Sequence, residues 1–332
     1  EALAHQRLHT QGLLREVRRS RGWDCLIQLG KEAMAECAQW KDLLEHWNGR
    51  SMVKNNPDTS VTTDASPFAW GAWLRKAIGQ EEWSAKGWFT TEESKNHINW
   101  KELLTVLFAV RAAGRRLHNC NIRLETDNMV CMAYVNGQGG RKPGLSRLAE
   151  TLWKTLLDMG STMSAVHLAG TKNERADALS REKSDRYDWT LSSEFFQSHL
   201  APRWNFTVDA FASRLSKKME RFWSFKADPD ASAIDAMEQC WSGEMLFLNP
   251  PERMVGAVLA KLEKEEARGV LVCPCFSAAW TPLLLRCHQN SGEEAVPIPA
   301  QEFQPAMGNT HNPYGEKKWV IHAYPVSGKP RN

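Results

Sequence analysis

The sequence lacks any apolar run long enough to cross a bilayer. Its longest apolar stretches, residues 103–110 and 245–248, are far shorter than the roughly 20 residues that a membrane-spanning helix needs. No signal peptide is visible either. Because the first residue is Glu1 rather than Met, we expect that an upstream portion of the protein is missing. We expect no membrane among the partners of this chain.

Cysteine pairs with metal-ligand spacing are also lacking. The eight cysteines are dispersed, and several of them lie in apolar runs. No Cys-x-x-Cys pair occurs, and Cys273-Pro-Cys275 does not have the spacing of zinc ligands. These features argue against a zinc module. They predict buried free thiols in a reducing, intracellular compartment, without distinguishing cytoplasm from nucleus.

A strong excess of either charge is absent. The 42 Lys and Arg residues nearly balance the 39 Asp and Glu residues, which leaves a formal net charge of +3. Contacts with phosphate would therefore have to come from local patches. Two arginine clusters could form such patches, one within residues 15–21 and one within residues 111–116. Both clusters could equally well be solvent-exposed helix faces that bind nothing.

The 332 residues and the 42% hydrophobic content predict two globular domains. Residues 1–57 have helical periodicity, above all over 33–47, and end in a polar stretch. Residues 58–182 change to a mixture of strand and helix patterns. A polar linker is predicted over 183–193, and a second α/β domain over 194–332.

The patterns of 58–182 predict a mixed sheet with flanking helices. The predicted strands cover 61–64, 69–75, 83–89, 121–127 and 163–168, and the first three form a meander around Gly79. The predicted helices cover 99–117, 129–136, 145–159 and 174–181. In the second domain we predict strands over 206–211, 245–249, 269–274 and 318–324, with helices over 255–267 and 278–287.

Four acids in 58–182 fall where such a sheet would gather them. Asp64 and Asp127 each stand at the end of a predicted strand. Glu102 lies one turn into the long helix, and Asp177 lies at the start of the last helix. Strand ends and helix starts can converge on one edge of a sheet, where carboxylates repel unless cations lie between them. Oxygen ligands suit Mg²⁺ or Mn²⁺. Two such ions about 4 Å apart activate water and stabilise the leaving oxygen in phosphodiester cleavage.

Each acid also has a purely structural interpretation. Asp64 could cap the turn that follows it, and Glu102 stands three residues after an asparagine, the spacing of a capping box. Asp127 could be the N-cap of the next helix, and Asp177 a first-turn acid favoured by the helix dipole. Glu125 shares a strand face with Asp127 and competes with it. A single acid is weak support, but the ordered set of four predicts a metal site.

Residues 58–182 resemble the ribonuclease H domain of reverse transcriptases, especially those of DIRS-like tyrosine-recombinase retrotransposons. Four motifs carry the resemblance: Thr63-Asp64-Ala-Ser66, His97-Ile-Asn-Trp-Lys-Glu102-Leu, Thr126-Asp127-Asn128 and Gly170-Thr-Lys-Asn173-Glu-Arg-Ala-Asp177-Ala-Leu-Ser-Arg181. The resemblance implies the ribonuclease H fold and hydrolysis of the RNA strand of RNA–DNA hybrids. It assigns the ligands of two Mg²⁺ or Mn²⁺ ions to Asp64, Glu102, Asp127 and Asp177.

The same resemblance implies partners. Residues 1–57 resemble the tail that joins the polymerase to this domain, so the upstream reverse transcriptase polymerase is an expected partner. The hybrid would be bound across its wide, shallow minor groove. We expect Ser66 and Asn128 to contact the RNA, and Arg141, Lys142 and Arg147 to contact the DNA phosphates, although the last group could belong to a simple turn.

One position departs from the family pattern. Cellular relatives carry a histidine in the loop before the last acid, and this histidine is thought to help product release. Residues 170–174 contain none, and His167 lies earlier, on a predicted strand. We interpret His167 as a structural strand residue, and we expect slower turnover rather than loss of the site.

Asn249-Pro250-Pro251 leaves a predicted strand, where an amide and rigid carbonyls can bind the amino group of a flipped base. A plain rigid loop explains this turn as well. Together with Val208-Asp209-Ala-Phe-Ala-Ser213, Asp235-Ala236, Trp241 and residues 270–274 with Trp280, the turn makes residues 194–332 resemble the Dam-like adenine methyltransferase domain that follows ribonuclease H in the same retroelements. The resemblance implies a Rossmann-like fold, S-adenosylmethionine near Asp209 and a target base near Asn249. Glu252 stands where active members have an aromatic residue, and no Gly-rich loop follows the first strand, so we expect a fold kept for binding or architecture.

The leading hypothesis is a metal-dependent endonuclease that acts on the RNA of hybrids during retroelement reverse transcription. The alternative is a catalytically silent nucleic-acid-binding or scaffold fragment, and the ordered acids argue against it only for 58–182. An integrase- or transposase-like nuclease is a third hypothesis. Because that class lacks the glutamate of the first long helix, Glu102 distinguishes the two kinds of nuclease.

Overall fold

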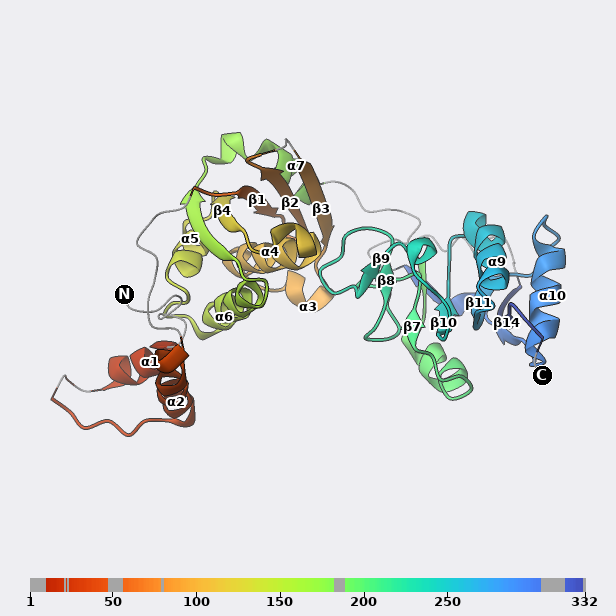
Figure 1. Cartoon of the computed structure of the whole chain (residues 1–332), viewed down its shortest axis with the longest axis horizontal. Coiled ribbons are helices and arrows are strands. Elements are labelled where there is room, and N and C mark those ends of the chain that lie inside the picture. The colour runs from red at the N-terminus through yellow and green to blue at the C-terminus, as the bar shows by residue number, and fades with distance from the viewer. Residues whose placement is uncertain are drawn as a thin grey trace. The chain divides into compact units, whose positions relative to one another are not determined.

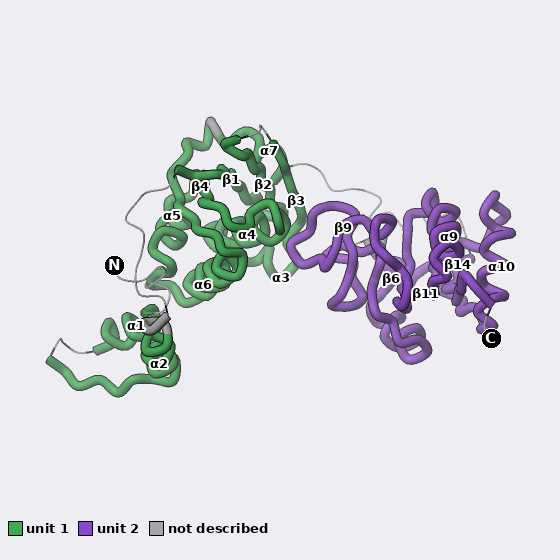
Figure 2. The backbone as a smooth tube through the Cα atoms, in the orientation of Figure 1, with its two compact units in different colours: residues 1–182 green, residues 183–332 purple. Residues whose placement is uncertain are grey.

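The computed structural model describes residues 10–20, 22, 24–46, 56–78, 81–181, 189–305 and 320–330. They belong to two compact units, residues 1–182 and residues 183–332 (Figure 2). The predicted turn at Gly79 and most of the predicted linker lie outside the described residues. From Trp189 onward that linker is structured instead: β6 (Trp189–Leu191) pairs with β13 (Phe303–Pro305) in the second unit.

Two helices come first in the chain. α1 (Gln11–Arg19) and α2 (Lys31–His46) lie in the segment for which helical periodicity was found. The buried Glu36 carboxylate of α2 accepts hydrogen bonds from the backbone N–H groups of Gly12 (2.7 Å) and Leu13 (2.8 Å). Because the first N–H groups of a helix have no partner within it, this contact both caps α1 and joins the two helices.

A five-stranded mixed sheet forms the centre of the first unit (Figure 1). Its strands are β1 (Thr59–Ala65), β2 (Ala69–Lys76), β3 (Glu82–Trp88), β4 (Asn121–Thr126) and β5 (Thr162–His167). Their order is β3-β2-β1-β4-β5. The first three strands are antiparallel neighbours, whereas β4 and β5 run parallel to β1. The predicted mixed sheet is confirmed, with small changes at the strand ends.

Helices cover both faces of this sheet (Figure 1). They are α3 (Thr91–Ser94), α4 (Ile98–Ala113), α5 (Met129–Asn136), α6 (Pro143–Asp158) and α7 (Glu174–Arg181). α4 packs on β1 and β2 and against α5 and α6, and nearly all its side chains beyond the first turn are buried. α7 packs on β1 and β2 from the other face. The α4 side therefore holds most of the core.

The long helix is shorter than predicted. It covers 98–113 rather than 99–117, and a single 3₁₀ turn (Gly114–Leu117) follows. Gly114 has a φ of 52°, a left-handed conformation that glycine adopts without a Cβ penalty, so the α-helix ends there. The short helix α3 was not predicted; it begins with a capping box between Thr90 and Glu93.

A glycine lets α7 lie directly on the sheet. Gly71 of β2 is the register partner of Asp64 on β1. A Cβ at Gly71 would lie 2.5 Å from the Ala176 carbonyl oxygen and 2.6 Å from Leu179 Cβ. Any larger residue would push α7 away. The close approach brings α7 onto the strand end that carries Asp64.

The second unit has its own five-stranded sheet. Its strands are β7 (Val208–Asp209), β10 (Met245–Leu248), β11 (Arg268–Pro274), β12 (Val296–Ile298) and β14 (Ile321–Ser327), in the order β12-β14-β11-β10-β7. β7, β10 and β11 are parallel, and β14 is antiparallel to both of its neighbours. The first predicted strand is reduced to β7, and the last one extends further, to Ser327.

Two apolar layers cover this second sheet. α9 (Val255–Lys264) and α10 (Thr281–Ser291) pack with Leu246 and Leu248 of β10, whereas Phe247 joins the other layer. This alternation is the period of two that a strand imposes. Smaller elements complete the unit: α8 (Ser193–Phe195), β8 (Trp223–Ser224) and β9 (Ala233–Ile234).

The cysteines are free, as predicted, but most of them are not buried. Cys131, Cys273 and Cys287 are buried, and the other five are at least partly accessible. The prediction failed because a neighbouring apolar run does not make a thiol face the core. Among the helices in the described parts of the chain, none is long and apolar enough to span a membrane.

Candidate metal centre

Glu102 reaches the end of the central strand from α4. The N-cap of α4 is His97, whose Nδ1 accepts a hydrogen bond from the Asn99 N–H, so the capping-box interpretation of Glu102 is wrong. Glu102 is only 4% exposed. Its Oε1 lies 3.4 Å from the Ala65 N–H, and its buried Oε2 has no hydrogen-bond partner among the described residues.

The Glu102 carboxyl is electrostatically perturbed. The pKa of Glu102 is raised to about 9, first by burial and then by the neighbouring Asp64 and Asp127 carboxylates. A carboxyl that is unpartnered, buried and next to two other acids is unfavourable when charged. A cation between the three groups would remove this penalty.

Asp64 lies next to last in β1 and is also buried. Its Oδ2 accepts a hydrogen bond from Ser180 Oγ at 2.5 Å, and Asn173 Nδ2 lies 3.4 Å from its Oδ1. Burial raises the pKa of Asp64, the Ser180 hydroxyl lowers it, and the charges of Asp177 and Asp127 raise it. The turn-capping interpretation of Asp64 finds no support in these contacts.

Asp127 directly follows β4. The N-cap of α5 is the next residue, Asn128, whose Oδ1 accepts from the Cys131 N–H at 2.9 Å. Asp127 therefore does not cap the helix and faces the other two acids. One carboxylate oxygen from each of Asp64, Glu102 and Asp127 lies within 4.8 Å of the others. The structure thus brings three of the four predicted acids together.

The three carboxylates fit a divalent cation. They offer hard oxygen donors, two of them from buried residues, and one buried oxygen of Glu102 is unpartnered. Mg²⁺ and Mn²⁺ prefer such oxygen ligands, with water completing the shell. The set comes from a strand end, a helix and a second strand end, the arrangement expected from the sequence.

Solved structures give a comparison for the first unit. Ribonuclease H1 of Halobacterium salinarum NRC-1 is 24% identical with a TM-score of 0.30, over 36% of this chain and 92% of that chain. The N-terminal ribonuclease H domain of a Mycobacterium tuberculosis protein is 14% identical with a TM-score of 0.32, over 37% and 91%. A foamy viral protease–reverse transcriptase in complex with RNA/DNA hybrid is 17% identical with a TM-score of 0.25, over 50% and 22%. No family model and no curated protein matches the chain.

Because these identities and scores are low, the fold assignment depends on the sheet itself. Its order β3-β2-β1-β4-β5, with an antiparallel meander followed by two parallel strands, is that of the ribonuclease H fold. The first unit contains a ribonuclease H-like domain. The matched part covers about a third of the chain.

The fourth acid lies beside the cluster but not in it. Asp177 is in the first turn of α7, and its carboxylate pairs with Arg181 Nε at 2.6 Å. It is close enough to raise the pKa of Asp64. Its assignment as a metal ligand of the ribonuclease H-like domain stays a prediction.

The competing acid on β4 is engaged elsewhere. Glu125 accepts a hydrogen bond from Thr62 Oγ1 at 3.3 Å and pairs with Arg123 at 3.4 Å. His167 is an exposed strand residue at the end of β5, opposite Thr126, which directly precedes Asp127. Its position on a strand agrees with the prediction.

Of the five residues expected to contact nucleic acid, two make hydrogen bonds within the protein and three are exposed cations. The Ser66 hydroxyl closes the β1–β2 turn through both backbone groups of Ala69. Asn128 caps α5, and its Nδ2 donates to Asn99 Oδ1 at 3.0 Å, which joins the starts of α5 and α4. The three cations at the start of α6 are exposed: Arg141, Lys142 and Arg147. Contacts of all five with a hybrid stay predictions.

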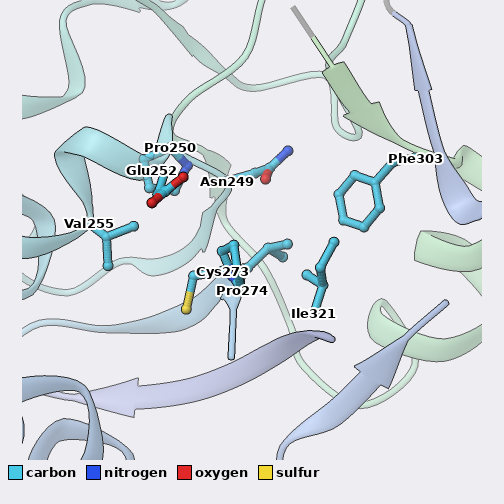
Figure 3. Close-up of a pocket in the computed structure, with 9 residues that line it drawn as sticks. Asn249, Pro250, Glu252, Val255, Cys273, Pro274, Phe303 and Ile321 are labelled. Atoms are coloured by element: carbon cyan, nitrogen blue, oxygen red, sulfur yellow. The ribbon is translucent and has the colours of Figure 1, made fainter. Parts of the chain in front are cut away.

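Two of the candidate residues of the second unit line a hollow. Asn249 and Pro250 do so with Glu252, Cys273 and Phe303 (Figure 3). Asp209 is not part of that lining; it ends β7, the parallel neighbour of β10, where its register partner is Phe247. Pro251 is exposed and is the N-cap of a 3₁₀ turn.

Asp209 of β7 binds the backbone of the loop that follows it. The residue is 2% exposed, and its Oδ2 accepts a hydrogen bond from the Lys218 N–H at 2.9 Å. The pKa of Asp209 is raised to about 7, because the effect of burial exceeds the opposing effects of the hydrogen bonds from the backbone of Lys218 and Phe211 and of the charge of Lys218. The Asp209 carboxylate is therefore buried and already accepts hydrogen bonds from the backbone of Phe211 and Lys218.

Proposed function

We propose that the ribonuclease H-like domain hydrolyses the RNA strand of RNA–DNA hybrids in a reaction that needs divalent cations, and that it serves retroelement reverse transcription. The observation that carries the proposal is the convergence of Asp64, Glu102 and Asp127 within 4.8 Å. Mg²⁺ or Mn²⁺ bound there would supply an activated water and stabilisation of the leaving oxygen. The retroelement setting is inferred from the sequence motifs around these acids.

Each residue has a defined part in this proposal. Asp64, Glu102 and Asp127 would hold the ions, and Asp177 would join them as a fourth ligand. α4 and β1 are packed against each other and Glu102 and Asp64 are buried, so we expect these carboxylates to need little reorganisation when a substrate binds. A ribonuclease H1 isolated from compost and a foamy viral reverse transcriptase have been solved with RNA/DNA hybrid, which makes a hybrid the substrate to test first.

The test is a cleavage assay on a labelled RNA–DNA hybrid beside duplex RNA and duplex DNA. We expect cleavage of the RNA strand of the hybrid only, in the presence of Mg²⁺ or Mn²⁺ and not of a chelator. Rates should fall steeply with salt, since Arg and Lys contacts to phosphates release counterions. Equal cleavage of duplex DNA, or cleavage in excess chelator, would contradict the proposal.

Mn²⁺ should raise the melting temperature of the first unit, because a ligand that binds only the folded state stabilises it by mass action. The gain should shrink in Asp64→Asn, which removes one ligand charge. Differential scanning calorimetry with and without Mn²⁺ measures both effects. Glu125→Gln is the control, since Glu125 pairs with Arg123 and should leave the gain unchanged. An undiminished gain in Asp64→Asn would place the ion elsewhere.

For the second unit we propose a role in binding or architecture rather than methyl transfer. The observation that favours it is the enclosure of Asp209, the residue expected near S-adenosylmethionine, by the backbone of Lys218. Glu252, in place of an aromatic residue, points in the same direction.

Isothermal titration calorimetry tests this role. We expect no heat with S-adenosylmethionine at about 1 mM, a concentration that would detect binding as weak as −4 kcal/mol. Saturable heat that is lost in Asp209→Asn would instead support the methyltransferase interpretation. The melting profile of that variant shows whether its fold is intact.

A further inference from the structure

We propose that Ser180 is a positioning residue, which together with Asn173 holds the Asp64 carboxylate in the orientation that a divalent cation requires. Neither residue was assigned a role from the sequence, although both lie in the motif that precedes and includes α7. The inference depends on the proposed metal centre. Ser180 acts through Asp64 and is not itself a ligand.

The two residues hold both oxygens of the Asp64 carboxylate. Ser180 Oγ donates to Oδ2 at 2.5 Å, and Asn173 Nδ2 lies 3.4 Å from Oδ1. Asn173 Nδ2 also donates to the Thr63 carbonyl oxygen at 3.2 Å, so this amide binds the strand end itself. A carboxylate has about four acceptor sites. Two donors therefore fix its plane and leave lone pairs for an ion.

Burial makes these contacts difficult to replace. Ser180 is 1% exposed, Asn173 2% and Asp64 8%. Water cannot readily substitute for a donor lost at such a site, so the carboxylate would be less constrained without it. The neighbouring Arg181–Asp177 pair is different, because its side chains are 72% and 40% exposed and solvent competes with it.

α7 is fixed firmly enough to position Asp64. Gly71 allows the helix to contact the sheet directly. Near its start, the Arg175 guanidinium lies 4.4 Å from the centroid of the Trp73 ring of β2. This contact and the packing of α7 on β1 and β2 set the place of the helix on the sheet. The hydroxyl therefore has a defined position relative to Asp64.

A serine at this position is not explained by helix formation. Alanine favours a helix more than serine does, and the Ser180 hydroxyl, which also contacts the Asp177 carbonyl oxygen at 3.0 Å, competes with the helix backbone. Ser180→Ala should therefore leave α7 intact. A purely structural serine would affect stability, whereas a positioning serine affects how well Asp64 binds an ion.

The experiment measures Mn²⁺ affinity of the full chain by isothermal titration calorimetry. Loss of a hydrogen bond to a metal ligand typically weakens metal binding 10–100-fold, and we expect a decrease in this range for Ser180→Ala. Ser180→Cys keeps a weak donor of similar size and should fall between alanine and the parent. Ser164→Ala, on the exposed side of β5, is the matched control and should bind as the parent does.

Three outcomes are distinguishable. Weaker Mn²⁺ binding by Ser180→Ala, with cooperative unfolding of the metal-free protein and cleavage restored at high Mn²⁺, supports the proposal. Equal binding by parent and Ser180→Ala overturns it and leaves the metal centre in place. Failure of the parent itself to bind Mn²⁺ overturns the metal centre and this inference with it. If Ser180→Ala does not fold, Ser180→Cys against the parent decides.

Discussion

Asp127→Asn should abolish metal-dependent cleavage of an RNA–DNA hybrid. The substitution keeps the size and shape of the side chain but removes one ligand charge from the group of three carboxylates. Stabilisation of the transition state by bound cations amounts to several kcal/mol, so the expected loss is roughly a thousandfold or more in kcat. Single-turnover cleavage at saturating Mg²⁺ measures the chemical step directly.

Asp127 suits this test because its removal should not disturb the fold. It follows β4 and is the least buried of the three acids, and the cap of α5 is supplied by Asn128. Glu125→Gln is the matched control on the same strand and should stay within a few-fold of the parent. If Asp127→Asn cleaved at the parental rate, the assignment of the site would be wrong.

Glu102→Gln should stabilise the metal-free protein at neutral to alkaline pH while it eliminates cleavage. The pKa of Glu102 is raised from 4.5 to about 9, first by burial and then by Asp64 and Asp127. Between these two pH values the folded protein holds a proton that the unfolded chain has already released. The free energy of unfolding of the metal-free protein therefore falls as the pH rises from 4.5 to about 9.

Glutamine removes this proton and the pH dependence that it causes. At pH 8 without metal we expect the free energy of unfolding of Glu102→Gln to exceed that of the parent by on the order of 2 kcal/mol, with a much smaller difference at pH 5. Denaturant unfolding in the presence of a chelator at both pH values measures it. At saturating Mn²⁺ the parent should again have the higher free energy of unfolding, because it has all three ligand charges and the variant does not.

Glu125→Gln again serves as the control and should show no such difference between pH 5 and pH 8. A less stable Glu102→Gln protein at pH 8 without metal would show that the charged carboxylate has a stabilising partner. The two substitutions thus address the same site in different ways: Asp127→Asn tests what the cluster does, and Glu102→Gln tests its electrostatic cost.

Local pattern predicted the elements of the first unit well and those of the second less well. The five strands of the first sheet end close to their predicted residues, because strand and helix periods alternate cleanly there. In the second unit, β7 is much shorter than predicted. Its apolar run continues beyond Asp209, but the Asp209 carboxylate binds the backbone of Lys218 and the chain leaves the sheet.

Caps were assigned less reliably than elements. Asn99 and Asp127 both have the sequence signature of a helix start, but His97 and Asn128 are the caps. Several polar residues within one turn can each supply an acceptor to the same N–H groups. The backbone position of the first helical residue decides among them, and that position depends on packing.

The sequence by itself determined the five strands and the longer helices of the ribonuclease H-like domain, with small changes at their ends, and the acids that stand near those ends, because periodicity and spacing are properties of neighbouring residues. Only the tertiary structure decided what each acid contacts. Ser180 is 116 positions from the Asp64 carboxylate that it binds. Asp177, equally prominent in its motif, pairs with Arg181 instead of joining the other three acids. Such partners come together only when the helices pack on the sheet, since burial and distance set the energy of each contact.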